Sequence, residues 1–130
     1  MHYLTEALVI EDDPDARRLV SGCLRGMGLH VVEAASAGEG AALLEQMTPD
    51  VVCLDLRLPD ENGLALCERM RASARLRDIP VVAVTALSRP IDRARAEVAG
   101  VDDYVTKPFR ASALTASVRE LIALSAVAAS

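Results

Sequence analysis

Polar side chains that could do chemistry follow four of the short apolar runs in this sequence. They are Glu11, Asp12 and Asp13 after the first run, Asp55 after the third, Thr85 after the fourth and Lys107 after the fifth. If these runs are strands of one parallel sheet, their carboxyl ends meet at a single edge, where sites form in such sheets. We therefore expect these carboxylates, the hydroxyl group and the ammonium group to lie close together.

The expected cluster of carboxylates favours a divalent cation. Two carboxylates about 4 Å apart repel by about 4 kcal/mol at an effective dielectric constant of about 20, unless a cation or protons intervene. Oxygen ligands with no neighbouring His or Cys are typical of Mg²⁺. Lys107 would add a second positive charge, and Thr85 a hydroxyl group. Such a site is suited to receiving a phosphoryl group, with Asp55 as the nucleophile that forms an acyl phosphate.

Each of these residues also has an ordinary structural explanation. Asp13 directly precedes Pro14, so we expect it to cap the N-terminus of a helix rather than to bind a metal. The other acidic residues could be solvated strand ends, Thr85 a β-branched strand terminus, and Lys107 a surface charge. Only the joint arrangement of these residues favours a functional site.

Five short apolar runs predict the strands that would position these side chains. The runs cover residues 7–10, 29–32, 51–54, 81–84 and, more weakly, 104–106. The first, third and fourth are continuously apolar, which is typical of strands buried on both faces, so we expect them at the centre of the sheet. Amphipathic stretches alternate with the runs, and this alternation predicts an α/β fold with a five-stranded parallel sheet between helices.

Five helices are predicted between and after these strands. The clearest has apolar residues at helical spacing over 16–27 and is closed by Gly28; the others cover 40–47 before Pro49, 66–70 after Gly63, 90–98 before Gly100, and 114–122. The βα units fill the chain, so we expect a single domain over residues 1–130. The Ala- and Ser-rich end from Ala126 to Ser130 is expected to fray.

Composition limits the partners and the location of the chain. It has 130 residues, 52% of them hydrophobic, with 14 Lys and Arg against 19 Asp and Glu. The acidic balance argues against direct contact with nucleic acid. No apolar run approaches the roughly 20 residues of a membrane span, and the N-terminus lacks the features of a secretory signal. We therefore expect a soluble, cytoplasmic domain without membrane insertion.

The cysteines predict no disulfide framework and no metal clip. Cys23, Cys53 and Cys67 are odd in number, widely spaced and set within apolar patterns. We expect buried, reduced thiols.

Four segments together resemble the receiver domain of response regulators in two-component signal transduction, a family that includes the chemotaxis regulators. They are ALVIEDDPDARRLV, VVCLDLRLPDENGLAL, IPVVAVTA and AGVDDYVTKPF, in the family's order and spacing. The resemblance runs from about Leu8 to about Leu124. It implies a flavodoxin-like fold with strand order 2-1-3-4-5, a Mg²⁺ cofactor, and phosphorylation of one Asp by a histidine kinase or a histidine phosphotransfer protein.

The resemblance also implies a role for individual residues around the phosphoryl group. The phosphoacceptor falls on Asp55, and the acidic pair falls on Glu11 and Asp12. In the family the second acid binds Mg²⁺ directly and the first mainly through water. The remaining protein ligand is the main-chain carbonyl two residues after the phosphoacceptor, here that of Arg57.

Further assignments from the resemblance concern the response to phosphorylation. Thr85 would supply the hydroxyl group and Lys107 the ammonium group that bind the phosphoryl oxygens. Tyr104 would be the switch aromatic, and Lys107–Pro108 would be a cis peptide. The side chains of Arg57 and Leu87 occupy positions that tune the lifetime of the phosphate in the family.

The function that this resemblance implies is a signalling receiver that is not an enzyme beyond its own phosphorylation and dephosphorylation. Its conformational switch would act on a downstream protein through the fourth helix, the fifth strand and the fifth helix. A phosphatase of the haloacid dehalogenase class is an alternative, since it uses an Asp nucleophile, Mg²⁺ and a lysine. Its motif would place a second Asp where this sequence has Arg57. A structural interaction domain with an incidental acidic edge is a third reading.

Overall fold

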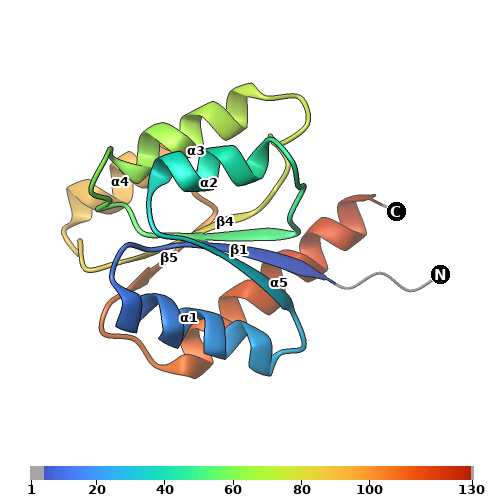
Figure 1. The fold of residues 1–130 in the computed structure, drawn as a ribbon, viewed down its shortest axis with the longest axis horizontal. Coiled ribbons are helices and arrows are strands. Elements are labelled where there is room, and N and C mark those ends of the chain that lie inside the picture. The colour runs from blue at the N-terminus through green and yellow to red at the C-terminus, as the bar shows by residue number, and fades with distance from the viewer. Residues whose placement is uncertain (1–4, 130) are drawn as a thin grey trace.

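Five short strands form one parallel sheet in the computed structural model, which describes residues 5–129 of the chain (Figure 1). The strands are β1 (Glu6–Ile10), β2 (His30–Ala34), β3 (Val51–Leu54), β4 (Val81–Thr85) and β5 (Asp103–Thr106). Their order is β2-β1-β3-β4-β5, and every neighbouring pair is parallel. The flavodoxin-like order is confirmed, and β1, β3 and β4 are internal as their continuous apolarity predicts.

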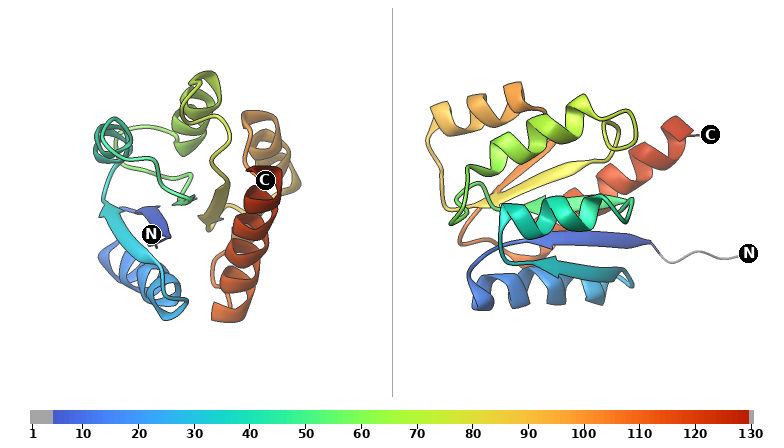
Figure 2. Two further views of the ribbon diagram at one scale, coloured as in Figure 1. Left: turned by 90° about the vertical axis from the view of Figure 1, so that its right-hand side faces the viewer. Right: turned by 45° about the horizontal axis from the view of Figure 1, so that its top comes forward.

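Five helices alternate with the strands and cover both faces of the sheet. They are α1 (Pro14–Gly26), α2 (Ala37–Leu44), α3 (Gly63–Ala72), α4 (Pro90–Ala99) and α5 (Ala111–Ala129). The helices α1 and α5 lie on one face, and α2, α3 and α4 lie on the other (Figures 1 and 2). Each connection between parallel strands thus contains a helix, as is usual for such crossovers.

Alternation of side chains along the strands divides the core into two aliphatic clusters. The cluster under α2, α3 and α4 includes Leu8, Ile10, Val52, Leu54, Leu66 and Met70. The cluster under α1 and α5 includes Val9, Val20, Leu24, Val84, Leu114 and Val118. Because β1, β3 and β4 supply residues to both clusters, the strands that carry the candidate site are held from both sides.

The cysteines are divided between the two clusters and form no disulfide. Cys53 and Cys67 are buried, whereas Cys23 is only half-buried. Burial raises the pKa of the Cys53 thiol to about 12. Cys53 is therefore a protonated core residue at neutral pH.

Two helix ends differ from the sequence pattern. The second helix was expected to reach Met47, but α2 ends at Leu44, and the guanidinium group of Arg75 donates hydrogen bonds to the main-chain oxygens of Leu44 and Met47. These bonds give the two main-chain oxygens the donors that another helical turn would otherwise supply. The end of the chain from Ala126 is expected to fray, but α5 continues to Ala129; Ser130 lies outside the described residues. Alanine has the highest helix propensity, which favours this extension.

Within residues 5–129, one segment, Ala111–Ala128 of α5, has the length and hydropathy of a membrane-spanning helix. The expectation from composition did not foresee such a segment. It contains Arg119 and Glu120, and its Leu114 and Val118 are fully buried in the cluster shared with α1. We therefore assign α5 as a core helix of the domain.

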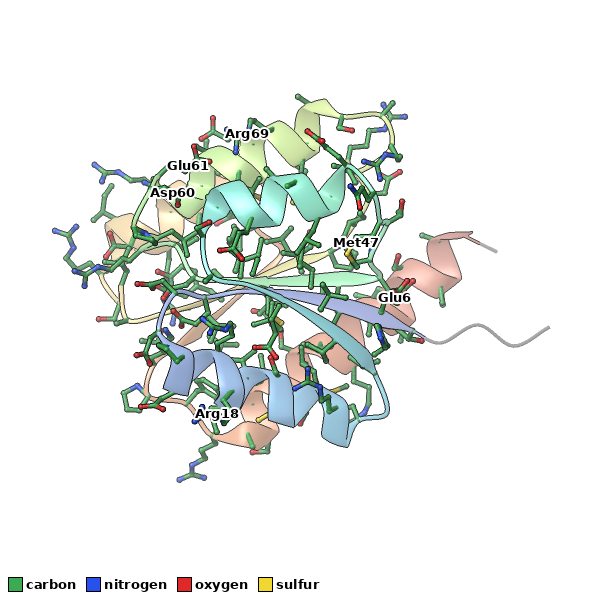
Figure 3. All side chains as sticks on the ribbon, viewed as in Figure 1. Glu6, Arg18, Met47, Asp60, Glu61 and Arg69 are labelled. Carbon is green, nitrogen blue, oxygen red and sulfur yellow. The ribbon has the colours of Figure 1, made fainter. Side chains whose placement is uncertain are left out.

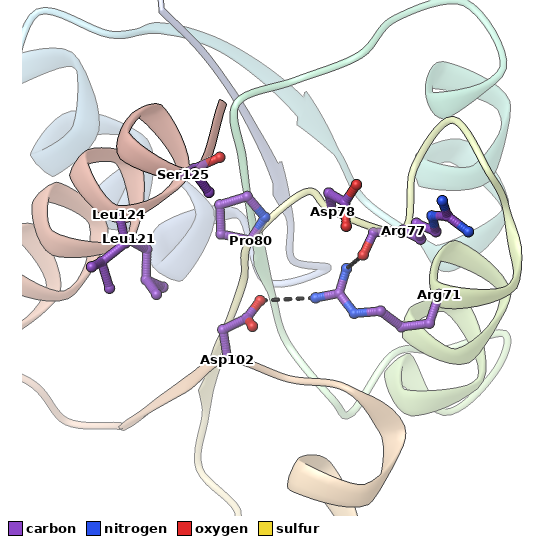
Figure 4. Close-up of a pocket in the computed structure, with 9 residues that line it drawn as sticks. Arg71, Arg77, Asp78, Pro80, Asp102, Leu121, Leu124 and Ser125 are labelled. Carbon is purple, nitrogen blue, oxygen red and sulfur yellow. Dashed lines mark hydrogen bonds and ion pairs between the residues drawn. The ribbon is translucent and has the colours of Figure 1, made fainter. Parts of the chain in front are cut away.

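Arg71, near the end of α3, joins α3 to the connection between α4 and β5 (Figure 4). Its Nε and Nη2 donate to the Gly100 oxygen at 3.0 and 2.8 Å, Nη2 also donates to Asp102 at 2.8 Å, and Nη1 donates to the oxygens of Arg77 and Ile79. All five N–H groups of the guanidinium therefore have acceptors. Gly100 has a φ of 101°, and a Cβ there would lie 2.7 Å from the Arg71 Cγ. Glycine is thus required at this position by both its backbone conformation and its neighbour.

Candidate functional site

The carboxyl ends of the strands bring the predicted site residues to one edge of the sheet. Ile10 pairs with Leu54, so Glu11 and Asp55 leave two adjacent strands side by side. The main-chain N–H of Asp55 donates to the Ile10 oxygen at 3.0 Å, which extends the ladder into the site. β5 lies beside β4 and ends at this edge, so Lys107 enters the same region.

Three carboxylates meet at this edge. Glu11, Asp12 and Asp55 can each present an oxygen within 4.8 Å of the other two. Glu11 and Asp55 are buried, with 3% and 7% of their surface exposed, whereas Asp12 is exposed. This set offers hard oxygen ligands and one side open to water, which suits Mg²⁺ because this ion retains several waters when bound to protein. The residues present therefore fit the expected cofactor.

Asp13 lies outside this group and caps α1. Its Oδ2 accepts a hydrogen bond from the main-chain N–H of Ala16 at 2.8 Å, and Pro14 occupies the first turn of the helix. The prediction that Asp13 is a helix cap is confirmed.

Lys107 supplies a positive charge inside the cluster. Its Nζ donates to Asp55 Oδ2 at 2.9 Å and forms a second hydrogen bond to Glu11. The Lys107–Pro108 peptide is cis. The ammonium group thus bridges the ends of β1 and β3 from the loop that follows β5.

Burial and charge change the ionisation of this cluster. Burial raises the pKa of Glu11 from an ordinary value of 4.5 to about 7, against the hydrogen bond from Lys107, and the charge of Asp55 adds to the rise. Burial alone would lower the pKa of Lys107, but its hydrogen bonds to the two carboxylates outweigh burial and raise it. Lys107 therefore stays charged at neutral pH, and Glu11 is the member of the pair that titrates there.

The loop after β3 is shaped to present main-chain groups next to Asp55. Asp55 Oδ1 accepts from the N–H of Arg57 at 3.0 Å, and Arg57 forms an isolated bridge with Asn62. A Cβ on Gly63 would lie 2.6 Å from the Asp55 oxygen, so only glycine allows α3 to start this close. The loop therefore holds the main chain at Arg57, whose carbonyl is the expected metal ligand, next to the acidic cluster.

Asp60 ties the same loop to the start of α2, a contact that sequence reasoning missed. Its two carboxylate oxygens accept from the N–H groups of Ala37 and Gly38 at 3.0 and 2.8 Å. These hydrogen bonds lower the pKa of Asp60. Asp60 and its neighbour Glu61 lie beside the N-terminal end of α2, whereas Met47 lies beyond its C-terminal end (Figure 3). No local signal in the sequence connects Asp60 to α2, because its partners are main-chain groups that any residue supplies.

Thr85 and Tyr104 lie beside the cluster. The loop that follows β4 links them, because it begins after Thr85 and contains Leu87, the partner of Tyr104. Thr85 is fully buried, and its main-chain oxygen accepts from the N–H of Lys107 at 2.8 Å. The Tyr104 hydroxyl donates to the Leu87 oxygen at 2.6 Å, and the Arg93 guanidinium lies 4.7 Å from the centre of its ring. Tyr104 is therefore half-buried and tied to the loop after β4, rather than facing freely into solvent.

Comparison with known proteins identifies relatives over nearly the whole chain. Residues 7–119 match the family described as the response regulator receiver domain. The DNA-binding dual master transcriptional regulator RpaA of Synechocystis is 42% identical over 115 residues, which are 88% of this chain and 48% of that protein. The DNA-binding response regulator MtrA of Mycolicibacterium smegmatis is 35% identical over 112 residues, which are 86% of this chain and 48% of that protein. The chain thus spans about half the length of the curated relatives it matches.

Solved structures of similar fold agree with this match. A CheY-like response regulator receiver domain protein from Methanospirillum hungatei has a TM-score of 0.88 and 26% identity, covering 95% of this chain and 97% of that one. The receiver domain of a sensor histidine kinase from Pseudomonas aeruginosa has a TM-score of 0.85 and 29% identity, and the match covers 93% of this chain and 99% of that one. That structure holds a magnesium ion coordinated in its active site cleft.

Proposed function

The chain belongs to the response regulator receiver domain family, and we propose that Asp55 is the residue that accepts its phosphoryl group. Receiver domains accept a phosphoryl group on Asp from histidine kinases and relay the signal to an effector. The observation that carries the assignment is the position of Asp55, which is buried next to two other carboxylates and held 2.9 Å from the Lys107 ammonium. The donor is a histidine kinase or a histidine phosphotransfer protein.

In the proposed transfer, a carboxylate oxygen of Asp55 attacks the phosphorus of a phosphohistidine. A P–O bond forms as the P–N bond breaks, and the electron pair of the broken bond stays on the imidazole. The attack needs no general base, because a carboxylate oxygen has no proton that must be removed before it forms the P–O bond. Lys107 and the Thr85 hydroxyl then bind phosphoryl oxygens, which offsets part of the added charge of about −1.5 to −2.

Four groups would hold the metal in this proposal. They are the carboxylates of Glu11, Asp12 and Asp55 and the main-chain carbonyl of Arg57. When bound, Mg²⁺ supplies positive charge that offsets the charge on the phosphoryl oxygens. Asp12 is the exposed member of the group, which supports a direct ligand role with water completing the coordination.

In this proposal the chain is a signalling domain that catalyses only its own phosphorylation and dephosphorylation. A phosphatase of the haloacid dehalogenase class would carry a second Asp two residues after Asp55, where this chain has Arg57. Absence of turnover with p-nitrophenyl phosphate would support the receiver over the phosphatase.

We further propose a single receiver unit over residues 1–130 that acts in the cytoplasm through protein contacts. Phosphorylation would draw Thr85 toward Asp55 and move the loop that Tyr104 holds through Leu87, which changes the surface of α4, β5 and α5. The excess of acidic residues supports contact of residues 1–130 with a partner protein rather than directly with nucleic acid.

Intact mass after incubation with acetyl phosphate and Mg²⁺ tests the assignment. The wild-type protein should gain one phosphoryl group, and Asp55→Ala should gain none. Asp13→Asn is the matched control, because this change also removes a carboxylate from the same edge but keeps a capping side chain. Stoichiometric labelling of Asp55→Ala would overturn the assignment.

A further inference from the structure

We propose that Arg17 is a positioning residue for the metal site, because it holds the main chain of the two residues whose carboxylates form half of that site. This inference rests on the proposed function of the acidic cluster. Nη1 of Arg17 donates to the main-chain oxygens of Glu11 at 2.9 Å and of Asp12 at 3.3 Å. One guanidinium nitrogen thus joins two successive carbonyls of the loop between β1 and α1.

The two carbonyls need such a partner because the sheet ladder ends before them. β1 ends at Ile10, and the N–H of Glu11 makes the last ladder-like bond, to the Ala34 oxygen at 3.0 Å. The oxygens of Glu11 and Asp12 point to the start of α1, where Arg17 meets them. Hydrogen bonds from a charged donor are stronger than neutral ones, so Arg17 restrains this turn more than a neutral side chain would.

Asp12 depends most on this restraint. Glu11 is buried and bonded to Lys107, whereas Asp12 is exposed, so its carboxylate is directed into the site mainly by its own backbone. A restraint on the Asp12 carbonyl is therefore a restraint on the direction of the Asp12 carboxylate. On the other side of the turn, Asp13 caps α1, and its main-chain oxygen accepts from the N–H of Arg17.

Glu33 on β2 binds the Arg17 guanidinium at its Nε, away from the Nη1 that contacts the two carbonyls. Its Oε1 accepts from Arg17 Nε at 3.2 Å, and its Oε2 accepts from Arg25 Nη2 at 3.1 Å. Glu33 pairs in register with Val9, so β2 carries it alongside the end of β1. The carboxylate also offsets the charge of Arg17, and the guanidinium therefore acts on the metal site through geometry more than through its charge.

The neighbouring Arg18 provides a matched control. It pairs with Asp15 one turn earlier on α1, its side chain is 78% exposed, and it points away from the site (Figure 3). The Arg17 side chain is 22% exposed. The two arginines thus have the same charge and adjacent positions, but only Arg17 contacts the loop of the acidic pair.

The experiment measures Mg²⁺ binding to the unphosphorylated protein by amide chemical shifts, with Mg²⁺ alone as the probe. Arg17→Met should weaken binding about tenfold, as loss of an outer-shell partner typically does. Arg18→Met should change the affinity less than twofold. The direction of the change in Mg²⁺ affinity separates an effect of geometry from an effect of charge. If charge alone mattered, removal of a positive charge near a cation site should tighten Mg²⁺ binding. Unchanged or tighter binding in Arg17→Met would overturn the inference.

A second measurement separates positioning from a general loss of structure. The rate of labelling by acetyl phosphate should approach that of the wild type when Mg²⁺ saturates Arg17→Met, so that the half-saturating Mg²⁺ concentration rises and the limiting rate is kept. A limiting rate that falls as much as the affinity would contradict a positioning role. If Arg17→Met does not fold, Arg17→Gln undergoes the same titration with the same expected loss, since glutamine stays polar but is too short to bring its amide to the position of the Arg17 Nη1.

Failure of this inference and failure of the proposed function give different results. If the wild-type protein is not labelled on Asp55, the proposed function fails, while the Mg²⁺ titration still reports on Arg17. If the wild type is labelled and Arg17→Met binds Mg²⁺ like the wild type, only the role of Arg17 is wrong.

Discussion

The metal-free domain is expected to lose stability as pH rises from 5 to 8, and Glu11→Gln should remove that loss. The pKa of Glu11 is raised to about 7 in the folded protein from an ordinary value of 4.5, chiefly by burial. The folded state therefore holds this proton more tightly than the unfolded chain does. The resulting stabilisation is complete below about pH 4.5 and is lost as pH rises through about 7.

The size of the effect follows from the two pKa values. At about 1.4 kcal/mol for each pH unit between them, the free energy of unfolding should fall by about 3 kcal/mol from this group. The Glu11 side chain is 4% exposed, so solvent screening reduces this value little. Glutamine resembles the protonated acid in shape and charge. Glu11→Gln should therefore be within about 1 kcal/mol of the wild type near pH 5 and exceed its stability by up to about 3 kcal/mol near pH 8.5.

Urea unfolding followed by far-ultraviolet circular dichroism measures this difference, since the chain has no Trp to serve as a fluorescent probe. EDTA keeps the site free of metal, and Glu97→Gln on the exposed side of α4 controls for the loss of one negative charge. A difference between wild type and Glu11→Gln that is the same at pH 5 and pH 8.5 would refute the reasoning. A less stable Glu11→Gln at pH 8.5 would mean that the ion pair with Lys107 outweighs burial.

Other substitutions test separate parts of the structure. Asp12→Asn should abolish most Mg²⁺ binding in an amide-shift titration, whereas Asp13→Asn should spare it; the reverse result would move the acidic pair by one residue. Lys107→Ala should bind Mg²⁺ more tightly in the same titration, because the ammonium competes for the carboxylates, and weaker binding would contradict that competition. Thr85→Ala should reduce the shifts that beryllofluoride, a phosphoryl mimic, causes on α4 and β5, and equal shifts would exclude Thr85 from the switch. Leu24→Ala should lower the free energy of unfolding by about 2 to 5 kcal/mol in urea, as expected for a fully buried leucine.

The sequence predicts the strands and the acidic cluster because both depend on local patterns. The run of residues 51–54 coincides with β3, since a continuously apolar segment of this length can satisfy its burial only inside the sheet. Glu11, Asp55 and Lys107 converge because parallel strands deliver their carboxyl ends to one edge. Chain order and apolar patterning are therefore enough to gather the reacting groups.

Contacts to main-chain groups of other elements could not be predicted in this way. Arg17, Asp60 and Arg75 each bond to carbonyl or N–H groups of a segment distant in sequence or across a turn. Every residue has a main-chain carbonyl group, and all but proline have an N–H group. The residue type at the partner position therefore gives no sign of the contact. The early end of α2 at Leu44 was missed for this reason, since the carbonyl there is satisfied by Arg75 rather than by a local cap.

Two of the five hydrogen bonds of Arg71 go to the oxygen of Gly100, so the C-terminal end of α4 is fastened to α3. Ten residues with a rise of about 1.5 Å each give α4 a length of about 15 Å, so a tilt of about 10° about Gly100 would carry its first turn about 3 Å. That first turn follows the loop after β4, next to the site, while Gly100 stays fastened to α3. In such a tilt the displacement would increase from Gly100 to the first turn of α4, so a partner protein bound at that first turn would meet the largest change in position.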